Sequence, residues 1–257
     1  MKEEKPKYGW YVKNLVIGFN VLGILGLITF IYGFFISGLL NSILIISGIV
    51  IILLFLWPGF GMAMMNIILN YRKLKLLENN PSISIKSPKI LDVGCGTGRH
   101  AIKIAKSLKN GGHLYGIDIY NKAAIGGNAL ETIQKNARLE RVDDKTTFQY
   151  GSAIDIPFDN EMFDIVYFSS VLHELHMVDG PDKALDEAYR VLRPGGFLQI
   201  GEWNRGSWQL ISYCGIFCLV FKKYKYWIDL INKHGFKIRE QRKVGGFHTF
   251  SAIKPNK

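Results

Sequence analysis

Three closely spaced glycines mark the part of the sequence best suited to bind a ligand. Gly94, Gly96 and Gly98 follow directly on an apolar run at residues 90–93, and Asp92 lies two residues before the first of them. Glycine permits unusual backbone dihedral angles and the close approach of a ligand, and the helix expected next offers free N–H groups to a negative ligand group. A dinucleotide fingerprint, G-x-G-x-x-G, would need glycine where this chain has Arg99. The spacing therefore predicts a cofactor loop of another class.

Alternating strands and helices are expected to hold this loop. Short apolar runs predict strands at residues 90–93, 113–117, 147–150, 164–168 and 197–201, and helical stretches at 99–108, 123–137 and 183–192 lie between them. Such alternation is typical of parallel strands with crossover helices. The last residues, around Gly245 and Gly246, predict an antiparallel pair at the edge. We expect an α/β domain over residues 81–257, with a doubly wound, mostly parallel sheet.

The first 80 residues have a different composition and predict a membrane anchor. No charged residue occurs between Lys13 and Arg72, whereas a soluble domain has a charge at about every fourth position. Apolar runs at residues 15–36 and 39–57 are each long enough to cross a bilayer. Pro58, Gly59 and Gly61 are expected to end the second span, and an interfacial helix is expected at residues 62–77.

Lysines and arginines flank this hairpin at both ends, so the positive-inside rule places both ends and the following domain in the cytoplasm. The alternative is a pair of buried helices in a soluble protein, which would need a partner to cover nearly 60 uncharged residues.

Several segments together resemble the class I S-adenosylmethionine-dependent methyltransferases. "LDVGCGTGRH" resembles the first motif of that family, and "LYGIDIY" resembles the end of its second strand. "GSAIDIPFDNEMFDIVYFSSVLHEL" and "ALDEAYRVLRPGGFLQIGEW" resemble its third to fifth strands, the latter in the form typical of the small-molecule and lipid branch. The resemblance covers roughly residues 89–254 and implies a Rossmann-like methyltransferase that uses S-adenosylmethionine.

The resemblance also implies which residues bind the cofactor. The glycine loop would lie against the methionyl part, Asp92 would hold the loop and the amino group, and Asp118 would accept both ribose hydroxyls. Ile119 would lie against one face of adenine. Many relatives have Asp where this chain has Ser152, which can accept a hydrogen bond without a charge. The implied set is Asp92, Gly94, Cys95, Gly96, Gly98, Asp118, Ile119, Ser152, Ala153 and Ser169.

Methyl transfer from a sulfonium needs mostly positioning, and a base is required only when the acceptor is a hydroxyl, a thiol or a protonated amine. His173 is the first choice because it follows the strand end that faces the cofactor in this fold, and Glu174 is the second. His176, Glu202 and Trp203 are further choices, while a histidine at the start of a helix is often purely structural.

The net charge of +11 suits an anionic lipid surface or a nucleic acid. Because of the apolar hairpin we expect the bilayer and no nucleic acid, and the chain has Phe168-Ser169-Ser170-Val171 where a nucleic-acid methyltransferase would carry an N-P-P-Y type motif. The spacing of three cysteines predicts no metal site. We expect a membrane-resident or amphiphilic small-molecule acceptor. The alternatives are a non-catalytic module that retains the fold and a methyltransferase for a soluble small molecule or a protein.

Overall fold

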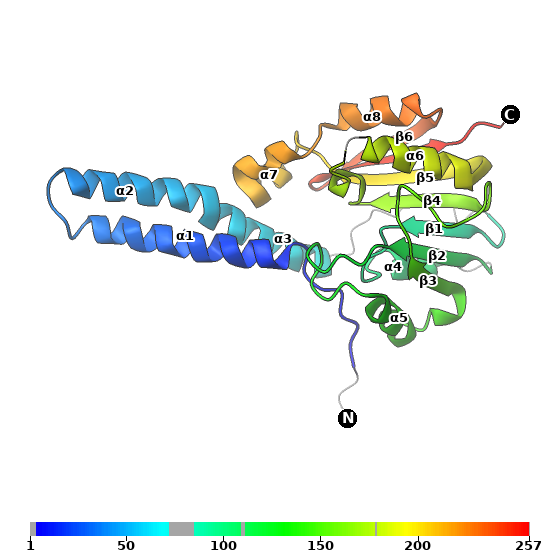
Figure 1. The fold of residues 1–257 in the computed structure, drawn as a ribbon, viewed down its shortest axis with the longest axis horizontal. Helices are drawn as coiled ribbons and strands as arrows, with labels where there is room; N and C mark the ends of the chain where they lie inside the picture. The colour runs from blue at the N-terminus through cyan, green and yellow to red at the C-terminus, as the bar shows by residue number, and fades with distance from the viewer. Residues whose placement is uncertain (1–3, 72–84, 109–110, 178, 257) are drawn as a thin grey trace.

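The computed structural model describes residues 4–71, 85–108, 111–177 and 179–256. Among them, seven strands form one sheet in the order β3-β2-β1-β4-β5-β7-β6 (Figure 1). The strands from β3 to β5 are parallel to their neighbours, whereas β7 is antiparallel to both β5 and β6. This confirms the predicted Rossmann-like sheet with its antiparallel edge pair. The strands are β1 (Lys89–Val93), β2 (His113–Asp118), β3 (Thr146–Tyr150), β4 (Phe163–Ser169), β5 (Leu192–Trp203), β6 (Lys237–Val244) and β7 (Phe247–Ile253).

Both faces of the sheet are buried beneath helices, as expected for parallel strands. Alternate residues of a strand point to opposite faces. In β1, Leu91 and Val93 pack in the same core as α6 (Gly180–Val191) and α8 (Tyr224–Lys233). Ile90 packs in the other core, with α4 (Ala101–Ser107) and α5 (Leu130–Leu139).

Residues 123–129 are not part of a helix, so the predicted helix at 123–137 is wrong over its first half. Gly127 has a φ of +80°, which interrupts helical geometry before Leu130. The backbone at 124–126 instead pairs with the chain's N-terminal segment: Val12 N–H donates to the Ala124 carbonyl, and Gly126 N–H donates to the Trp10 carbonyl.

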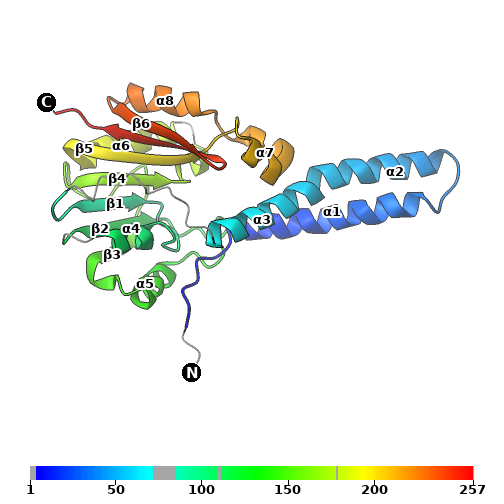
Figure 2. The same cartoon turned by 180° about the vertical axis from the view of Figure 1, so that it is seen from behind.

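Two long apolar helices project together from one end of the sheet (Figures 1 and 2). The first is α1 (Lys13–Gly33). The second is continuous and consists of α2 (Leu39–Ile51), a π-helical segment η1 (Ile52–Leu56) and α3 (Trp57–Tyr71). Both are long and apolar enough to cross a membrane. In the most apolar stretch of each helix, only 22% of the residues of the first and 6% of those of the second are buried within the protein. Their apolar surface therefore faces outward rather than into a protein core.

The second helix does not end at Pro58, so the predicted break before residue 62 is wrong. That the stretch beginning at residue 62 lies at a membrane interface stays a prediction. Proline lacks an N–H and its ring collides with the carbonyl four residues earlier, but a wider π-turn can accommodate it. Trp57 N–H accordingly donates to the Ile52 carbonyl, five residues back. Gly59 and Gly61 instead allow neighbouring segments to approach closely. A Cβ at Gly59 would lie 2.8 Å from the Asn20 amide nitrogen, and a Cβ at Gly61 would lie 2.3 Å from the Tyr213 carbonyl oxygen. Positions 72–77 of the predicted interfacial helix lie outside the described residues.

The base of the hairpin shares a core with the sheet. Val16 and Met65 of the hairpin pack in one cluster with Trp203 of β5 and Phe247 of β7. The cluster also contains residues from α7 (Trp208–Cys214) and the 3-10 helix η5 (Gly215–Val220), which follow β5.

Candidate active site

The glycine loop lies at the carboxyl end of β1 and is held against β2. The Ile117 carbonyl accepts from the N–H groups of Gly94 and Cys95, at 2.8 and 3.0 Å. Gly94 has a φ of +72°, and a Cβ there would lie 2.3 Å from Val171 Cγ2. Gly98 leaves room for a helix, because a Cβ at this position would lie 2.8 Å from Ile133 Cγ1 of α5. The last glycine of the loop thus permits α5 to pack closely against it.

Asp118, the last residue of β2, fixes the same loop. Its Oδ2 accepts from Gly96 N–H at 2.8 Å, and its Oδ1 accepts from Tyr120 N–H at 2.5 Å and from the Asn128 amide at 3.2 Å. Burial raises the pKa of Asp118, and these three donors counteract the increase. The carboxylate therefore couples the end of β2 to the loop that follows β1.

The residues expected around adenine lie next to Asp118. Gly151 N–H donates to the Asp118 carbonyl at 3.2 Å, which brings Ser152 and Ala153 to the carboxyl end of β2. Ile119 is 52% exposed and free to cover an aromatic ring. The structure thus brings the predicted adenine and ribose residues together.

A cavity of about 160 Å³ lies beside the glycine loop, and we call it the cofactor cavity. Asp92 lines it and is 1% exposed, yet its Oδ2 has no hydrogen-bond partner among the described residues. His100 Nδ1 lies 3.6 Å from the other carboxylate oxygen. A buried carboxylate oxygen without a partner is costly, and the ammonium group of a bound ligand would satisfy it. Of the predicted set, Asp92, Gly94, Cys95, Gly96 and Ser169 line the cavity, whereas Gly98, Asp118, Ile119, Ser152 and Ala153 lie outside its lining.

The Cys95 thiol has no feature of a nucleophile. Its Sγ is buried and lies 3.9 Å from the Tyr120 hydroxyl. Burial, and then the charges of Asp92 and Asp118, raise the pKa of this thiol well above its usual value. The side chain remains neutral and packs against β2.

His173 is held between two carboxylates. Its Nδ1 lies 2.6 Å from Glu202 Oε2 at the end of β5, and the other oxygen of Glu202 accepts from the N–H groups of Val171 and Leu172. Its Nε2 lies 2.9 Å from the hydroxyl of Tyr11, which in turn donates to Glu174. Both predicted catalytic residues are thus joined in one network, together with Glu202.

This network favours the charged form of His173. Burial lowers the pKa of the imidazole, but the charge of Glu202 and the hydrogen bonds to Glu174 and Glu202 outweigh burial and raise it to about 9. The hydrogen bond from His173 lowers the pKa of Glu174 to about 2. Burial, and then the charge of Glu174, raise the pKa of Tyr11 well above its usual value. At neutral pH, Nδ1–H therefore donates to Glu202, and Nε2–H faces both the Tyr11 hydroxyl and, at 3.3 Å, Glu174 Oε1. The Tyr11 hydroxyl donates to Glu174.

A second, much larger cavity of about 990 Å³ lies on the other side of Tyr11, and we call it the acceptor cavity. Tyr11 and Trp203 line both cavities. His173 and Glu174 lie in the wall of the acceptor cavity, together with polar groups such as Asp182 and Lys222. The remaining lining is mostly apolar. Much of it comes from the hairpin and from α7–η5, including Leu15, Phe19, Met62, Met65, Leu210, Phe217 and Val220.

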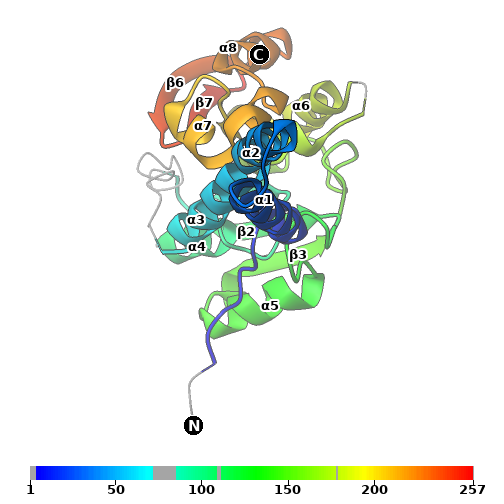
Figure 3. The same ribbon diagram turned by 90° about the vertical axis from the view of Figure 1, so that its left-hand side faces the viewer.

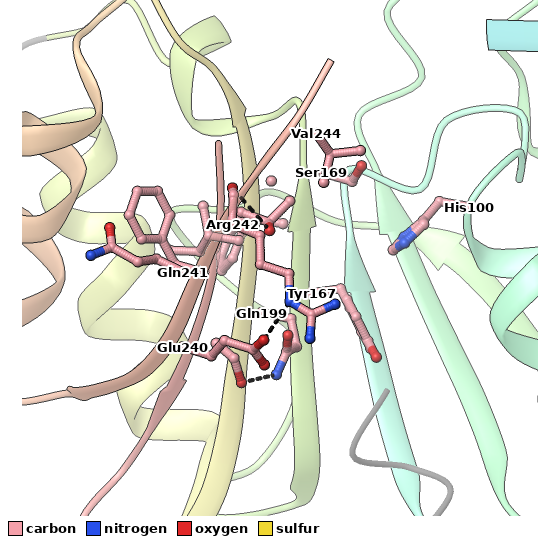
Figure 4. Close-up of a pocket in the computed structure, with 14 residues that line it drawn as sticks. His100, Tyr167, Ser169, Gln199, Glu240, Gln241, Arg242 and Val244 are labelled. Carbon is pink, nitrogen blue, oxygen red and sulfur yellow. Dashed lines mark hydrogen bonds and ion pairs between the residues drawn. The ribbon is translucent and has the colours of Figure 1, made fainter. Parts of the chain in front are cut away.

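A third cavity, of about 50 Å³, adjoins the first and shares His100 and Ser169 with it. Figure 4 shows the Arg242 side chain, paired with Glu240, beside Gln199 and Tyr167. This cavity is too small for a nucleotide-sized cofactor. In the described part of the chain, no group of three or more histidine, cysteine, aspartate and glutamate residues is arranged to hold a metal ion.

Tyr8 and Tyr11 line the cofactor cavity and are absent from the predicted set of site residues. They belong to a segment we call the N-terminal strap, residues 7–12, which crosses the glycine loop. The Tyr8 carbonyl accepts from the Thr97 hydroxyl at 2.8 Å, and the Gly9 carbonyl accepts from Arg99 at 2.8 Å. Motif reasoning cannot find such residues because they lie about 90 positions from the loop that they contact.

Comparison with known proteins identifies the domain that carries this site. The family described as "Methyltransferase domain" matches residues 91–200. Residues 91–200 are therefore similar to a methyltransferase domain, which confirms the family resemblance of the sequence.

Individual relatives agree with this class. The chain is 36% identical over 117 residues to 27-O-demethylrifamycin SV methyltransferase of Amycolatopsis mediterranei, covering 45% of this chain and 38% of the relative. It is 34% identical over 125 residues to a demethylmenaquinone methyltransferase of Lactiplantibacillus plantarum, covering 48% of each. The match thus spans less than half of either curated relative. A methyltransferase structure from Aquifex aeolicus shares the fold, with a TM-score of 0.60 at 17% identity over 77% of this chain and 98% of that one.

Proposed function

We propose that this protein transfers the methyl group of S-adenosylmethionine to a membrane-resident or amphiphilic small molecule. The proposal rests mainly on one observation: a large, mostly apolar cavity, partly walled by the hairpin, shares Tyr11 and Trp203 with the cofactor cavity. S-adenosylmethionine in the cofactor cavity and a methyl acceptor in the acceptor cavity would meet at Tyr11 and Trp203.

The cofactor fits the residues around the glycine loop. The unpartnered oxygen of Asp92 would take its amino group, the loop would lie against its methionyl part, and Asp118 would take the ribose hydroxyls. Ile119, Ser152 and Ala153 would surround adenine, and Ser169 would line the entrance. Bound there, S-adenosylmethionine supplies a methyl group activated by a sulfonium.

The acceptor cavity suits a molecule with one polar end and one apolar end. Its polar groups belong to the catalytic domain, at His173, Glu174 and Asp182, whereas the hairpin contributes Leu15, Phe19, Met62 and Met65. Apolar pockets with a few convergent polar groups are typical small-molecule sites. The reacting head would lie beside His173, and the apolar part would extend toward the hairpin.

His173 is the proposed proton acceptor for a hydroxyl or ammonium group. Its Nε2 is the ring nitrogen on the side of Tyr11 and the acceptor cavity, and Glu202 keeps the other nitrogen protonated. The neutral imidazole is needed for this step. Because the pKa of His173 is raised to about 9, methyl transfer to such an acceptor should increase with pH up to that value.

The hairpin is the proposed membrane anchor. Its two helices are long and apolar enough to cross a bilayer, and most of their surface is exposed. We propose two spans with the catalytic domain on the cytoplasmic side. Anchoring raises the effective concentration of a lipid-soluble acceptor at the site.

The direct test uses the full chain, S-adenosylmethionine with a radioactive methyl group, and isolated membranes, followed by extraction with organic solvent. We expect label in the organic phase, and much less with His173→Ala. Label that stays in the aqueous phase or in protein would reject the amphiphilic acceptor while retaining the methyltransferase. No transfer at all, from a chain that binds S-adenosylmethionine, would favour a non-catalytic module.

A further inference from the structure

The segment formed by α7 and η5 is apolar on two opposite faces. Its inner side chains, including Leu210 and Phe217, line the acceptor cavity. Three outer apolar side chains are largely exposed, Trp208 at 81%, Ile216 at 57% and Leu219 at 57%, and the exposed polar residues Gln209 and Ser212 lie in the same segment. Large exposed apolar side chains that lie together mark a surface that contacts a membrane or another protein. The described residues leave Trp208, Ile216 and Leu219 uncovered.

The position of this segment along the hairpin corresponds to the surface of a bilayer. From Leu39 to Trp57 the second helix covers about 27 Å at about 1.5 Å per residue, close to the hydrocarbon thickness of roughly 30 Å. Trp57 is thus placed at the inner interface, where tryptophan is enriched. The Trp57 indole N–H donates to the Ser212 carbonyl of α7 at 3.1 Å. In the view along the hairpin, α7 lies directly beside it (Figure 3).

The charges next to this segment match anionic lipid. Lys222, Lys223 and Lys225 follow η5 and are exposed. No aspartate or glutamate occurs between Glu202 and Asp229. Exposed lysines beside an apolar face are typical of interfacial helices, which bind headgroups and insert their apolar side chains.

We propose that the outer face of α7–η5 is a second membrane-contacting surface, inserted into the cytoplasmic leaflet beside the hairpin, with the three lysines on anionic headgroups. The inference rests on the proposed membrane anchor. The same segment walls the acceptor cavity, so its insertion opens that cavity toward the leaflet. The acceptor would therefore enter sideways from the lipid rather than from the cytosol.

Fluorescence quenching in vesicles tests this placement. Full-length variants with one new cysteine are labelled with a bimane fluorophore and reconstituted in vesicles of equal parts phosphatidylcholine and phosphatidylglycerol. Leu219→Cys reports on η5, Ile28→Cys on the exposed side of α1, and Tyr150→Cys on an exposed apolar site at the end of the edge strand β3. The native cysteines are buried, so the unsubstituted chain is the labelling blank.

We expect nitroxide-labelled lipids to quench the probes at 28 and 219, and aqueous iodide to quench only the probe at 150. Quenching at 219 by iodide, with position 28 still quenched by lipid, would overturn the inference and leave the anchor intact. Quenching at 219 by neither agent would also overturn it, in favour of coverage by a second copy of the chain. Absence of lipid quenching at 28 would refute the anchor, and the inference with it.

A charge series separates lipid attraction from apolar insertion. Replacing Lys222, Lys223 and Lys225 by Gln should reduce lipid quenching at 219 in the anionic vesicles to the level found in phosphatidylcholine alone. The matched control replaces Lys86, Lys89 and Lys237, which are exposed near the opposite end of the sheet. It removes the same charge and should leave the quenching unchanged. Equal losses in both triple variants would reject the role of the three lysines.

Discussion

The unpartnered oxygen of Asp92 leads to a test of the cofactor site at the scale of single residues. Asp92→Asn should weaken S-adenosylmethionine binding roughly ten- to hundredfold, because one charge-assisted hydrogen bond is worth about 1.5–3 kcal/mol. Titration calorimetry measures the change. Asp164→Asn is the matched control, since Asp164 is also buried but binds Lys89 N–H and Arg193 at the start of β4. It should reduce stability without changing affinity, and equal affinity in both variants would contradict the role of Asp92.

The contact between Glu202 and His173 makes a second prediction. Glu202→Gln removes the largest of the contributions that raise the pKa of the imidazole, and leaves burial, which lowers it, and Glu174, which raises it. The pKa of His173 should therefore fall from about 9 toward its ordinary value, as measured by NMR titration of labelled histidines. The signal of His113, whose pKa is lowered by burial in the wild type, should not change. A His173 pKa that stays high would show that Glu202 is not the dominant partner.

The same pKa sets a pH window for stability. The folded-state pKa of about 9 lies above the ordinary value of 6.5, so the contribution to stability is complete below pH 6.5 and is lost as the pH rises through 9. This contribution of His173 to the free energy of unfolding is at most about 3 kcal/mol, because each unit of pKa difference corresponds to about 1.36 kcal/mol. Thermal unfolding in detergent should show a fall in melting temperature over this interval for the wild type and a smaller fall for Glu202→Gln. Parallel curves for both proteins would contradict this linkage.

At the scale of elements, the two hairpin helices bury little apolar surface and are held together by close backbone contacts at glycines. A Cβ on Gly23 would lie 2.5 Å from Leu56 Cα, whereas a Cβ on Gly18 would meet nothing within 4 Å. Small residues permit such close packing of membrane helices. Gly23→Leu should therefore destabilise the protein by about 1–3 kcal/mol, seen as a lower melting temperature in detergent. Gly18→Leu is the control and should have little effect; similar losses would mean that the helices do not meet at Gly23.

Local sequence predicted those elements whose geometry depends on near neighbours. The first four strands were predicted within one residue at each end, because apolar runs bounded by turn residues reflect burial on both faces of a sheet, whereas β5 begins five residues before its predicted start at residue 197. Pro58 was misleading because its effect depends on whether the preceding turn can widen, and no single residue type indicates a π-turn. Residues 123–129 were misassigned because pairing with the strap replaces helical hydrogen bonds there.

The candidate site was predictable where a motif is contiguous and unpredictable where the fold brings distant segments together. Asp92, the glycine loop and Asp118 lie within a short stretch and converge as expected. Tyr11 and His173 are 162 positions apart, and nothing in the composition of the strap marks it as part of a site. The sequence did offer Glu202 as a further choice of base, but only the structure shows that it holds His173.

At the scale of the whole molecule, the strap makes the N-terminal region part of the catalytic unit. Deleting residues 1–12 should weaken S-adenosylmethionine binding at least tenfold even with the hairpin retained, because Tyr8 and Tyr11 line the cofactor cavity and Tyr8 holds Thr97. Deleting residues 1–6 leaves the strap in place and should have little effect. Calorimetry with both deletions measures the difference, and unchanged affinity in the longer deletion would show that the strap only covers a complete site.

The strap also determines when, during synthesis, the site can form. Tyr11 is bound to the second hairpin helix through Asn66, which accepts from its N–H at 2.8 Å and donates to its carbonyl at 3.2 Å. Its hydroxyl partners, His173 and Glu174, are translated more than 160 residues later, and domains form progressively as the chain emerges from the ribosome. With the proposed membrane anchor, the hairpin would enter the bilayer and fix Tyr11 long before the imidazole exists. Assembly of the candidate site would then be a late docking event, in which a newly made domain closes onto a segment already held in the bilayer.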